Sequence, residues 1–257
     1  MLLFLSCNSN YQKIVKGSDA DAKLAMAKEL YEKGDCYKAL PLFEEVIPVY
    51  KGTKNIDDIY YQYAECHFQQ GDYLIASFHF KNIYDSYPLS DYAEDCLYMN
   101  AYSYYMLSPD VNLEQTYTEK AIEYFQLFIN AYPESEKVKE ANQFIDVLRQ
   151  KLETKDFRSA QLYLKTGNYK AAAVSFTNML RKYPDTKYAE EASYLIVKSY
   201  YLYALNSIPG KQAERFENAR KAYDDFVYRY KDSKFTADAT EYYESVLEKI
   251  EKLKNLN

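Results

Sequence analysis

The chain has 257 residues, 48% of them hydrophobic, and a formal net charge of −6. A chain of this length can bury a sizeable core. Its acidic balance and scattered Lys and Arg residues give no electrostatic basis for binding nucleic acid. No apolar run approaches the roughly 20 residues of a membrane-spanning helix. The chain holds 6 Gly and 7 Pro but 31 Tyr and 13 Phe, and so few breakers indicate long helices with short connections.

The first feature is a short apolar run, MLLFLS, that ends at Cys7 and is followed by the polar stretch NSNYQKIVKGSDADAK. The segment FLSC is similar to a lipobox, in which a small residue such as Ser6 precedes the cysteine at which lipoprotein signal peptidase cuts. The resemblance implies that Cys7 carries acyl chains and that residues 1–17 are a lipobox remnant and polar tether. Asp is the common inner-membrane retention signal after that cysteine, so Asn8 implies transfer to the outer membrane. The alternative is an ordinary thiol in a frayed terminus.

The apolar run is too short for a complete signal peptide and lacks a basic segment. We therefore expect either a different start or a trimmed leader.

Helical repeats follow, and three of them align without gaps. They are GDCYKALPLFEEVIPVYK from Gly34, GDYLIASFHFKNIYDSYP from Gly71 and GNYKAAAVSFTNMLRKYP from Gly167. Two more, KAIEYFQLFINAYP from Lys120 and NARKAYDDFVYRYK from Asn218, lack the glycine. In all five an Ala is followed by an aromatic four residues later and a Tyr eleven residues later, which places the three on one helix face. The sets are Ala39, Ala76, Ala121, Ala172 and Ala219; Phe43, Phe80, Phe125, Phe176 and Tyr223; and Tyr50, Tyr87, Tyr132, Tyr183 and Tyr230.

Each repeat is predicted to be a helical hairpin. The glycines allow a tight turn, and a small residue seven positions before each of them, Ala27, Ala64 or Ala160, lies on the preceding helix. Proline cannot continue a helix, and one follows the repeat Tyr in three repeats, as Pro88, Pro133 and Pro184. The order of helix, turn, helix and stop resembles the tetratricopeptide repeat.

The repeat alanines are 37, 45, 51 and 47 residues apart, where about 34 is typical of this repeat. We assign the extra residues to an inter-helix loop over 107–117, a long connecting helix over 135–165, with a break near 154–156 as one option, and a loop over 205–216. A helix over 236–256 is expected to cap the stack. The predicted fold is all-α: a solenoid of about five helical hairpins, with repeats 1–3 in 18–134 and the connecting helix, repeats 4–5 and cap in 135–257.

No motif of catalysis or of cofactor binding is found, so we expect a non-catalytic protein without a cofactor. His67 and His79 share no metal-ligand spacing and are interpreted as packing or surface residues. An odd number of further cysteines, Cys36, Cys66 and Cys96, indicates half-buried free thiols rather than a closed disulfide framework. Paired acids such as Asp57–Asp58 and Glu190–Glu191 are expected on solvated helix faces.

The chain resembles one lipoprotein family in particular, the D lipoprotein (BamD) of the outer-membrane β-barrel assembly machinery. The resemblance covers nearly the whole chain and depends on FLSC, YPLSDYAEDCLYMNAYSYYML, the EQT–A segment over 114–121, and MLRKYPDTKYAEEA. It implies a scaffold at the periplasmic face of the outer membrane, held there by a lipid anchor. It also implies that the N-terminal repeats receive unfolded barrel precursors and that the C-terminal repeats dock on the periplasmic domains of the barrel-forming subunit.

Two other classes stay open. One is a periplasmic tetratricopeptide adaptor of the cell-division or Tol-associated type, although no heptad run for a trimerising coiled coil precedes Ser18. The other is a glycan-binding lipoprotein for nutrient uptake, which is usually longer and carries Trp platforms, whereas this chain has no Trp.

The partner-binding surface is predicted on the first helices of repeats 2 and 3, because in this repeat family those helices line the inner groove. The candidate residues are Tyr61, Glu65, Tyr98 and Tyr102. Tyrosine combines a flat apolar face with one polar end and is enriched in binding hot spots. The competing interpretation, which we hold open, is that these tyrosines fill space between repeats.

Overall fold

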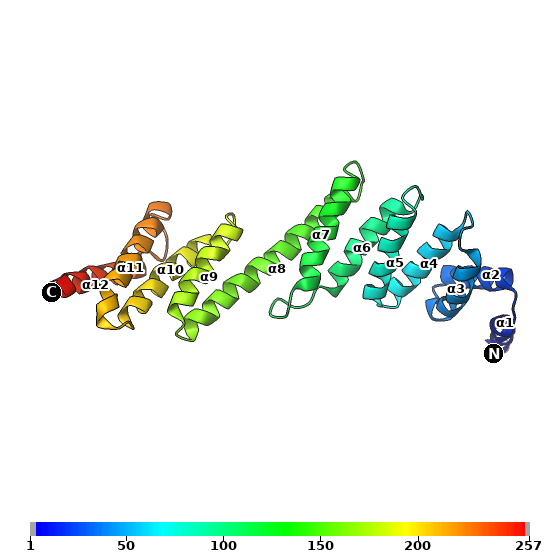
Figure 1. Cartoon of the computed structure of the whole chain (residues 1–257), viewed down its shortest axis with the longest axis horizontal. Helices are drawn as coiled ribbons and strands as arrows, with labels where there is room; N and C mark the ends of the chain where they lie inside the picture. The colour runs from blue at the N-terminus through cyan, green and yellow to red at the C-terminus, as the bar shows by residue number, and fades with distance from the viewer. Residues whose placement is uncertain (1–3, 255–257) are drawn as a thin grey trace. The chain divides into compact units, whose positions relative to one another are not determined.

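A computed structural model of the chain describes the backbone of residues 4–254 and the side chains of residues 10–253. All regular elements in this range are α-helices, and none of those searched is long and apolar enough to cross a bilayer. The chain divides into two compact units, unit 1 up to Arg149 and unit 2 from Gln150. The helices are α1 (Phe4–Lys16), α2 (Ala20–Glu32), α3 (Cys36–Tyr50), α4 (Ile56–Gln69), α5 (Tyr73–Ser86), α6 (Ala93–Leu107), α7 (Thr116–Ala131), α8 (Val138–Lys165), α9 (Tyr169–Lys182), α10 (Ala189–Leu205), α11 (Pro209–Arg229) and α12 (Thr236–Lys254) (Figure 1).

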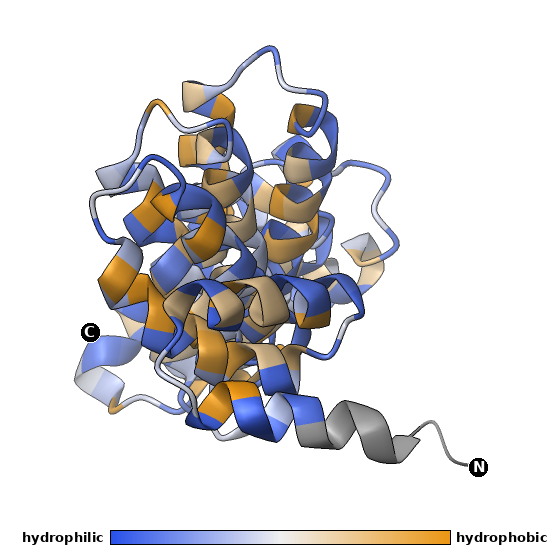
Figure 2. Cartoon of the chain, turned by 90° about the vertical axis from the view of Figure 1, so that its right-hand side faces the viewer, coloured by the Kyte–Doolittle hydropathy of each residue, from blue (hydrophilic) through white to orange (hydrophobic). Residues whose placement is uncertain are grey.

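Unit 1 is a stack of helical hairpins in which α2 pairs with α3, α4 with α5 and α6 with α7 (Figure 1). Hydrophobic and hydrophilic residues occupy different sides of the same helices (Figure 2), as expected where one face is buried. The repeat alanines and the aromatics four residues after them are fully buried in this unit: Ala39, Ala76, Ala121, Phe43, Phe80 and Phe125. The predicted tetratricopeptide register is therefore confirmed here.

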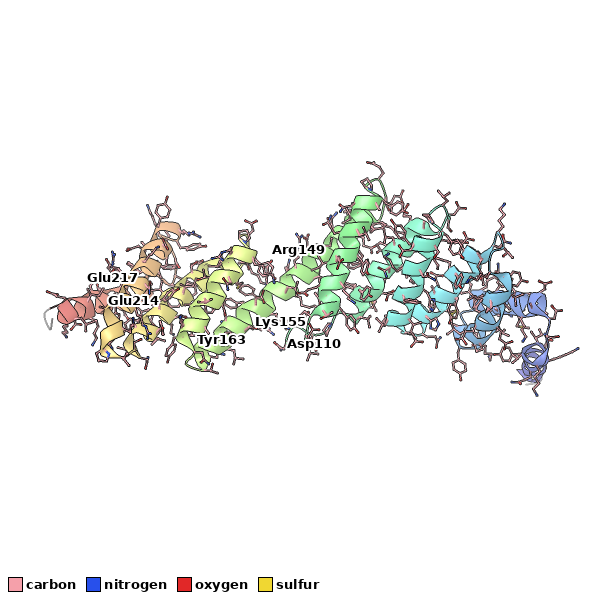
Figure 3. All side chains as sticks on the ribbon, in the orientation of Figure 1. Asp110, Arg149, Lys155, Tyr163, Glu214 and Glu217 are labelled. Atoms are coloured by element: carbon pink, nitrogen blue, oxygen red, sulfur yellow. A yellow bond between two sulfur atoms is a disulfide. The ribbon has the colours of Figure 1, made fainter. Side chains whose placement is uncertain are left out.

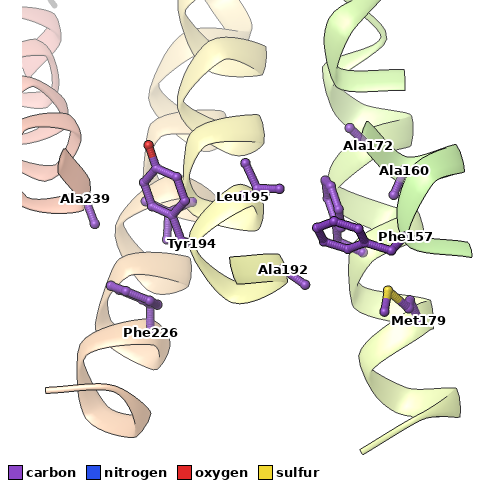
Figure 4. Close-up of a cluster of buried hydrophobic side chains, with 11 residues drawn as sticks. Phe157, Ala160, Ala172, Met179, Ala192, Tyr194, Leu195, Phe226 and Ala239 are labelled. Atoms are coloured by element: carbon purple, nitrogen blue, oxygen red, sulfur yellow. The ribbon is translucent and has the colours of Figure 1, made fainter. Parts of the chain in front are cut away.

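Unit 2 contains the second half of α8 and the helices α9 to α12. Its main core cluster joins Phe157 and Ala160 of α8, Ala172 of α9, Tyr194 of α10 and Ala239 of α12 (Figure 4). One detail of the register differs from the prediction. Tyr223 of α11 is only half-buried, whereas Phe226, three residues later, is fully buried.

Helix α8 is continuous over its 28 residues, so the optional break near 154–156 is not there. Its first half adds Ala141, Ile145 and Leu148 to a core cluster of unit 1, while Phe157 and Ala160 belong to a cluster of unit 2. The expected division at 134/135 assigned this whole helix to the second part, whereas the two compact units divide inside it, after Arg149.

The predicted glycine turns have the expected geometry. Gly34, Gly71 and Gly167 have φ values of 73°, 83° and 79°, in the left-handed region that glycine enters without steric cost. The next residue in each case donates its N–H to the carbonyl five residues before it, at 2.8–2.9 Å. These are Schellman motifs, which end one helix and start the return helix of the hairpin.

Two loops were predicted inside repeats, over 107–117 and over 205–216, and the second is shorter than predicted. The connection after Leu107 spans residues 108–115, close to the expected 107–117. The loop predicted over 205–216 is wrong, because α11 already begins at Pro209. Proline is well suited to the first helical position, since it has no N–H that needs a partner there.

The segment expected to be a polar tether is helical. Tyr11 and Val15 of α1, one helical turn apart, pack against the core cluster formed by α2, α3 and α4. The Tyr11 hydroxyl donates a 3.2 Å hydrogen bond to the Lys38 carbonyl. This segment therefore docks on α3. Cys7 lies outside the residues whose side chains are described, so its acylation remains a prediction.

The prediction of free thiols is wrong for two of the three cysteines. Cys36 and Cys66 form a disulfide that joins the start of α3 to α4, with Cα atoms 5.0 Å apart. Among the cysteines whose side chains are described, Cys96 is the free one, and it is buried. An odd number of cysteines did not exclude a disulfide, because two of the three pair and the third, Cys96, has no disulfide partner in the described part of the chain.

Candidate partner-binding surfaces

Tyr61 and Glu65 lie one turn apart on α4, and the structure brings them together. The Tyr61 ring stacks on Tyr92 with centroids 4.4 Å apart and meets the edge of Phe80 at 6.0 Å. Its hydroxyl donates to Glu65 at 3.3 Å and to Asp95 of the next repeat at 3.5 Å. Burial, helped by these two carboxylates, raises the pKa of Tyr61.

Tyr98 and Tyr102 lie one turn apart on α6 and stack with centroids 6.1 Å apart. Tyr98 is 7% exposed, its hydroxyl donates to Glu140 at 2.6 Å, and the Lys137 ammonium lies 5.0 Å from its ring centre. Burial and the hydrogen bond to Glu140 raise the pKa of Tyr98. A partner could therefore contact little of this side chain.

Tyr102 is half-buried and bridges three repeats through its ring. It stacks on Phe68 of α4 with centroids 5.6 Å apart and contacts Phe144 of α8 at 5.4 Å. The two predicted pairs lie on successive first helices, α4 and α6, which are linked by the contacts Tyr61–Asp95 and Tyr102–Phe68. We call the two pairs together the tyrosine face and define it by Tyr61, Glu65, Tyr98 and Tyr102.

A row of tyrosine–carboxylate hydrogen bonds runs along the first helices of successive repeats. Each tyrosine hydroxyl donates to an acid on the next such helix, 34 to 44 residues later. The pairs are Tyr31–Glu65, Tyr61–Asp95 and Tyr98–Glu140 in unit 1, and Tyr194–Asp238 in unit 2. These contacts show that the tyrosines pack between repeats. Binding by the remaining exposed ring surface and carboxylates is a separate property and stays a prediction.

The structure also shows inter-repeat contacts that the sequence analysis missed. In four repeats a Ser or Thr hydroxyl, three residues after the repeat Tyr, donates to an acid of the preceding first helix. Three of these acids lie in the first turn of their helix, and Glu153 lies in the second half of α8. The pairs are Ser90–Asp57, Ser135–Glu94, Thr186–Glu153 and Ser233–Glu190, at 2.5–2.9 Å. Acids that we interpreted as solvated are therefore partners of the next repeat. The signal was available, since every repeat Tyr is followed by Ser or Thr at that spacing.

His67 and His79 pack together rather than on the surface. Their rings stack with centroids 5.7 Å apart, and Tyr63 presents an edge to both, at 4.7 and 4.8 Å. His67 Nε2 and His79 Nδ1 are buried and have no hydrogen-bond partner among the residues that the structure describes. Burial, with a smaller contribution from His67, lowers the pKa of His79 to about 4.

Comparison with known proteins gives one family and two curated relatives. The family model described as "YfiO: Outer membrane lipoprotein" matches residues 18–216. The "Outer membrane protein assembly factor BamD" of Caulobacter vibrioides is 29% identical over 127 residues, which cover 49% of this chain and 41% of the relative. The protein of the same name from Rickettsia prowazekii is 30% identical over 138 residues, 54% of this chain and 51% of the relative. The matched part thus spans about half of each relative or less.

Two solved structures are similar at lower identity. The TPR2AB domain of yeast Sti1 in a pHSP90 complex aligns with a TM-score of 0.40 and 15% identity, over 92% of both chains. The TPR domain of P58(IPK) aligns with a TM-score of 0.43 and 14% identity, over 95% of this chain and 67% of that one.

Proposed function

The chain belongs to the family of outer membrane lipoproteins whose model matches residues 18–216, and we propose that it is a non-catalytic scaffold of outer-membrane β-barrel assembly. It is anchored through Cys7 at the periplasmic face of the outer membrane. It binds unfolded barrel precursors through unit 1 and the periplasmic domains of the barrel-forming subunit through unit 2. The family match and the two assembly-factor relatives support the assembly role most directly.

The tyrosine face supports the assignment of precursor binding to unit 1. Half-buried rings of Tyr61 and Tyr102 leave part of their apolar surface accessible, while the packing contacts described above fix their orientation. Fixed aromatic side chains lose little conformational entropy when a partner binds. The terminal strand of a barrel precursor, apolar at alternate residues and often ending in an aromatic, has the chemistry to pack on such rings.

The experiment for the assembly role is affinity purification of the tagged full chain from solubilised outer membranes, followed by identification of partners. Recovery of a barrel-forming subunit with periplasmic domains is the expected result. Recovery of division or Tol-associated proteins without that subunit would contradict the proposal and favour the adaptor class.

The tyrosine face is tested separately by titrating a labelled C-terminal barrel peptide against the full chain. Tyr61→Ala and Tyr102→Ala are each expected to weaken binding by about 1–2 kcal/mol. Tyr37→Ala is the matched control, because Tyr37 lies on α3 of the same unit and is 79% exposed. Circular dichroism must first show that all variants are folded. Equal affinities for the folded variants and wild type would move the precursor site off this face.

A further inference from the structure

Unit 2 contains a groove that no part of the tyrosine face contributes to. It lies between α9 and α11 over α10 and has a volume of about 550 Å³. Its floor is apolar and includes Leu180, Ile196, Ala222 and the fully buried Phe226. A floor of this kind takes an apolar side chain rather than a fully polar ligand.

The rim of the groove is basic. Arg181 comes from α9, and Lys221 and Arg229 come from α11. All three are exposed, and among the described residues none of them is within ion-pair distance of a carboxylate. Among the described residues that line the groove, Asp225 is the one acid, so these residues have a net charge of +2.

Other acids of α11 do not neutralise the rim. Glu214 and Glu217, labelled near the start of α11 in Figure 3, pair with Lys211 at 3.6 Å and Arg220 at 2.7 Å. Arg220 also pairs with Asp224 at 3.5 Å. Those carboxylates have cation partners of their own, whereas the three cations of the groove have no carboxylate partner in the described part of the chain.

The two units also differ in charge. Unit 1 has 13 Lys and Arg against 23 Asp and Glu, a net charge of −10, while unit 2 has 19 against 15, a net charge of +4. An acidic ligand is therefore attracted to unit 2 and repelled by unit 1. This long-range preference agrees with the local charge of the groove.

The spacing along α11 specifies the ligand further. Lys221, Asp225 and Arg229 follow one another at four-residue steps on one helix face, so the two cations lie about 12 Å apart along the axis with an acid between them. Two carboxylates about 12 Å apart would meet both cations and avoid Asp225. In an extended peptide that distance is about four residues.

We propose that the unit 2 groove binds an acidic segment of a protein partner, with two carboxylates four residues apart in extended chain and an apolar side chain between them. The apolar side chain fills the floor over Phe226, and the carboxylates meet Lys221 and Arg229 while Arg181 adds charge from the opposite wall. The proposal rests on the proposed function only in assigning unit 2 to a protein partner.

The test is a titration of the full chain with a labelled extended peptide that carries Glu, Phe and Glu at positions 1, 3 and 5. Lys221→Gln/Arg229→Gln is expected to weaken binding about tenfold, since it removes two partly exposed charge pairs. The matched control is Lys165→Gln/Lys231→Gln, which removes the same charge from exposed residues of unit 2 outside the groove and should stay within about twofold of wild type. A peptide with both Glu changed to Gln should bind as weakly to wild type as the acidic peptide binds to the groove variant.

Equal weakening by the two double variants would overturn the proposal, because it would show attraction by net charge alone. No binding of the peptide by folded wild type would also overturn it. Vesicles of phosphatidylglycerol, with phosphatidylcholine as control, test the competing ligand. Loss of vesicle binding only in the groove variant, with no peptide binding, would assign the groove to lipid headgroups. Since recovery of the barrel-forming subunit is measured independently, failure of the groove proposal is distinguishable from failure of the assembly role.

Discussion

The Ser90 hydroxyl donates a 2.6 Å hydrogen bond to the Asp57 carboxylate, 33 residues earlier in the chain. The same oxygen accepts the Tyr92 backbone N–H at 3.2 Å, and the Tyr92 ring stacks on Tyr61, one turn after Asp57. One serine therefore fixes the turn before α6 and links it to α4. This arrangement sets the register of one repeat on the next, and three further Ser or Thr residues repeat it.

Removing this link should destabilise unit 1. Because a hydrogen bond to a charged acceptor is lost at a half-buried site, Ser90→Ala is expected to lower the free energy of unfolding by about 1–2 kcal/mol. Thr53 occupies the equivalent position in the first repeat, but within the described part of the chain its hydroxyl donates to the nearby Tyr50 carbonyl and to no acid. Thr53→Ala should therefore cost less than about 0.5 kcal/mol. Urea unfolding followed by circular dichroism measures both, and equal losses would show that the link contributes nothing specific.

The repeat register can be tested with two adjacent alanines. Ala172 is fully buried where α9 meets its neighbours, while Ala171 is exposed. Ala172→Leu should overpack the crossing and cost roughly 1–3 kcal/mol, and Ala171→Leu should change stability little. Thermal unfolding of the two variants gives the comparison. If Ala171→Leu is the more damaging substitution, the register assigned to α9 is wrong.

The Cys36–Cys66 disulfide should stabilise unit 1 by limiting the unfolded chain. For a sequence separation of 30 residues, the chain-entropy estimate is about 3–4 kcal/mol. We expect the midpoint of unfolding to fall under reducing conditions, and the double variant Cys36→Ala/Cys66→Ala to be as unstable as reduced wild type and insensitive to reductant. A wild type that unfolds identically with and without reductant would contradict the bond's contribution.

Unit 1 should lose stability as the pH falls from about 6.5 to 4. His79 has a lowered pKa of about 4 in the folded chain, and an ordinary value near 6.5 applies when it is unfolded. Between these values the unfolded state binds the proton and the folded state does not, so the stability present above pH 6.5 is lost towards pH 4. Because His79 is only partly buried, solvent screens part of this effect, and the expected loss of unfolding free energy is about 1–2 kcal/mol.

The measurement is urea unfolding at a series of pH values for wild type and His79→Phe. The variant keeps an aromatic ring against Tyr63 but cannot take up a proton, so the difference between the two curves isolates His79. Parallel curves between pH 7 and 4 would show that His79 does not cause the loss.

Acylation at Cys7 predicts a change in location. Two or more acyl chains give stable membrane attachment, since each buried CH₂ contributes about 0.8 kcal/mol. Cys7→Ala should release the full-length protein to the soluble fraction, whereas Cys96→Ala, at the buried free thiol, should leave it on the membrane. If Cys7→Ala stays with the outer membrane and wild type carries no lipid mass, partner binding alone localises the protein.

The hairpin fold could be predicted from the sequence because its determinants are local. The Ala–aromatic–Tyr spacing indicates one face of a helix. Turns that need a positive φ are indicated by Gly34, Gly71 and Gly167, and helix ends are indicated by prolines. Each signal lies within one hairpin, so no knowledge of neighbouring repeats was needed. The prediction placed Tyr61, Glu65, Tyr98 and Tyr102 on the first helices of repeats 2 and 3, and that is where they lie.

The contacts between repeats were decided only by the tertiary structure. Ser90 donates its hydrogen bond to Asp57, 33 residues earlier in the chain. Cys36 forms its disulfide with Cys66 rather than with Cys96. Tyr98 is buried by α7 and α8 rather than exposed on an open surface. Spacing within a helix says which residues share a face, but not which residues of the next helix that face meets. Which residues meet depends on how successive hairpins rotate as they pack. In unit 2 this packing places Arg181 of α9 on the same groove as Lys221 and Arg229 of α11.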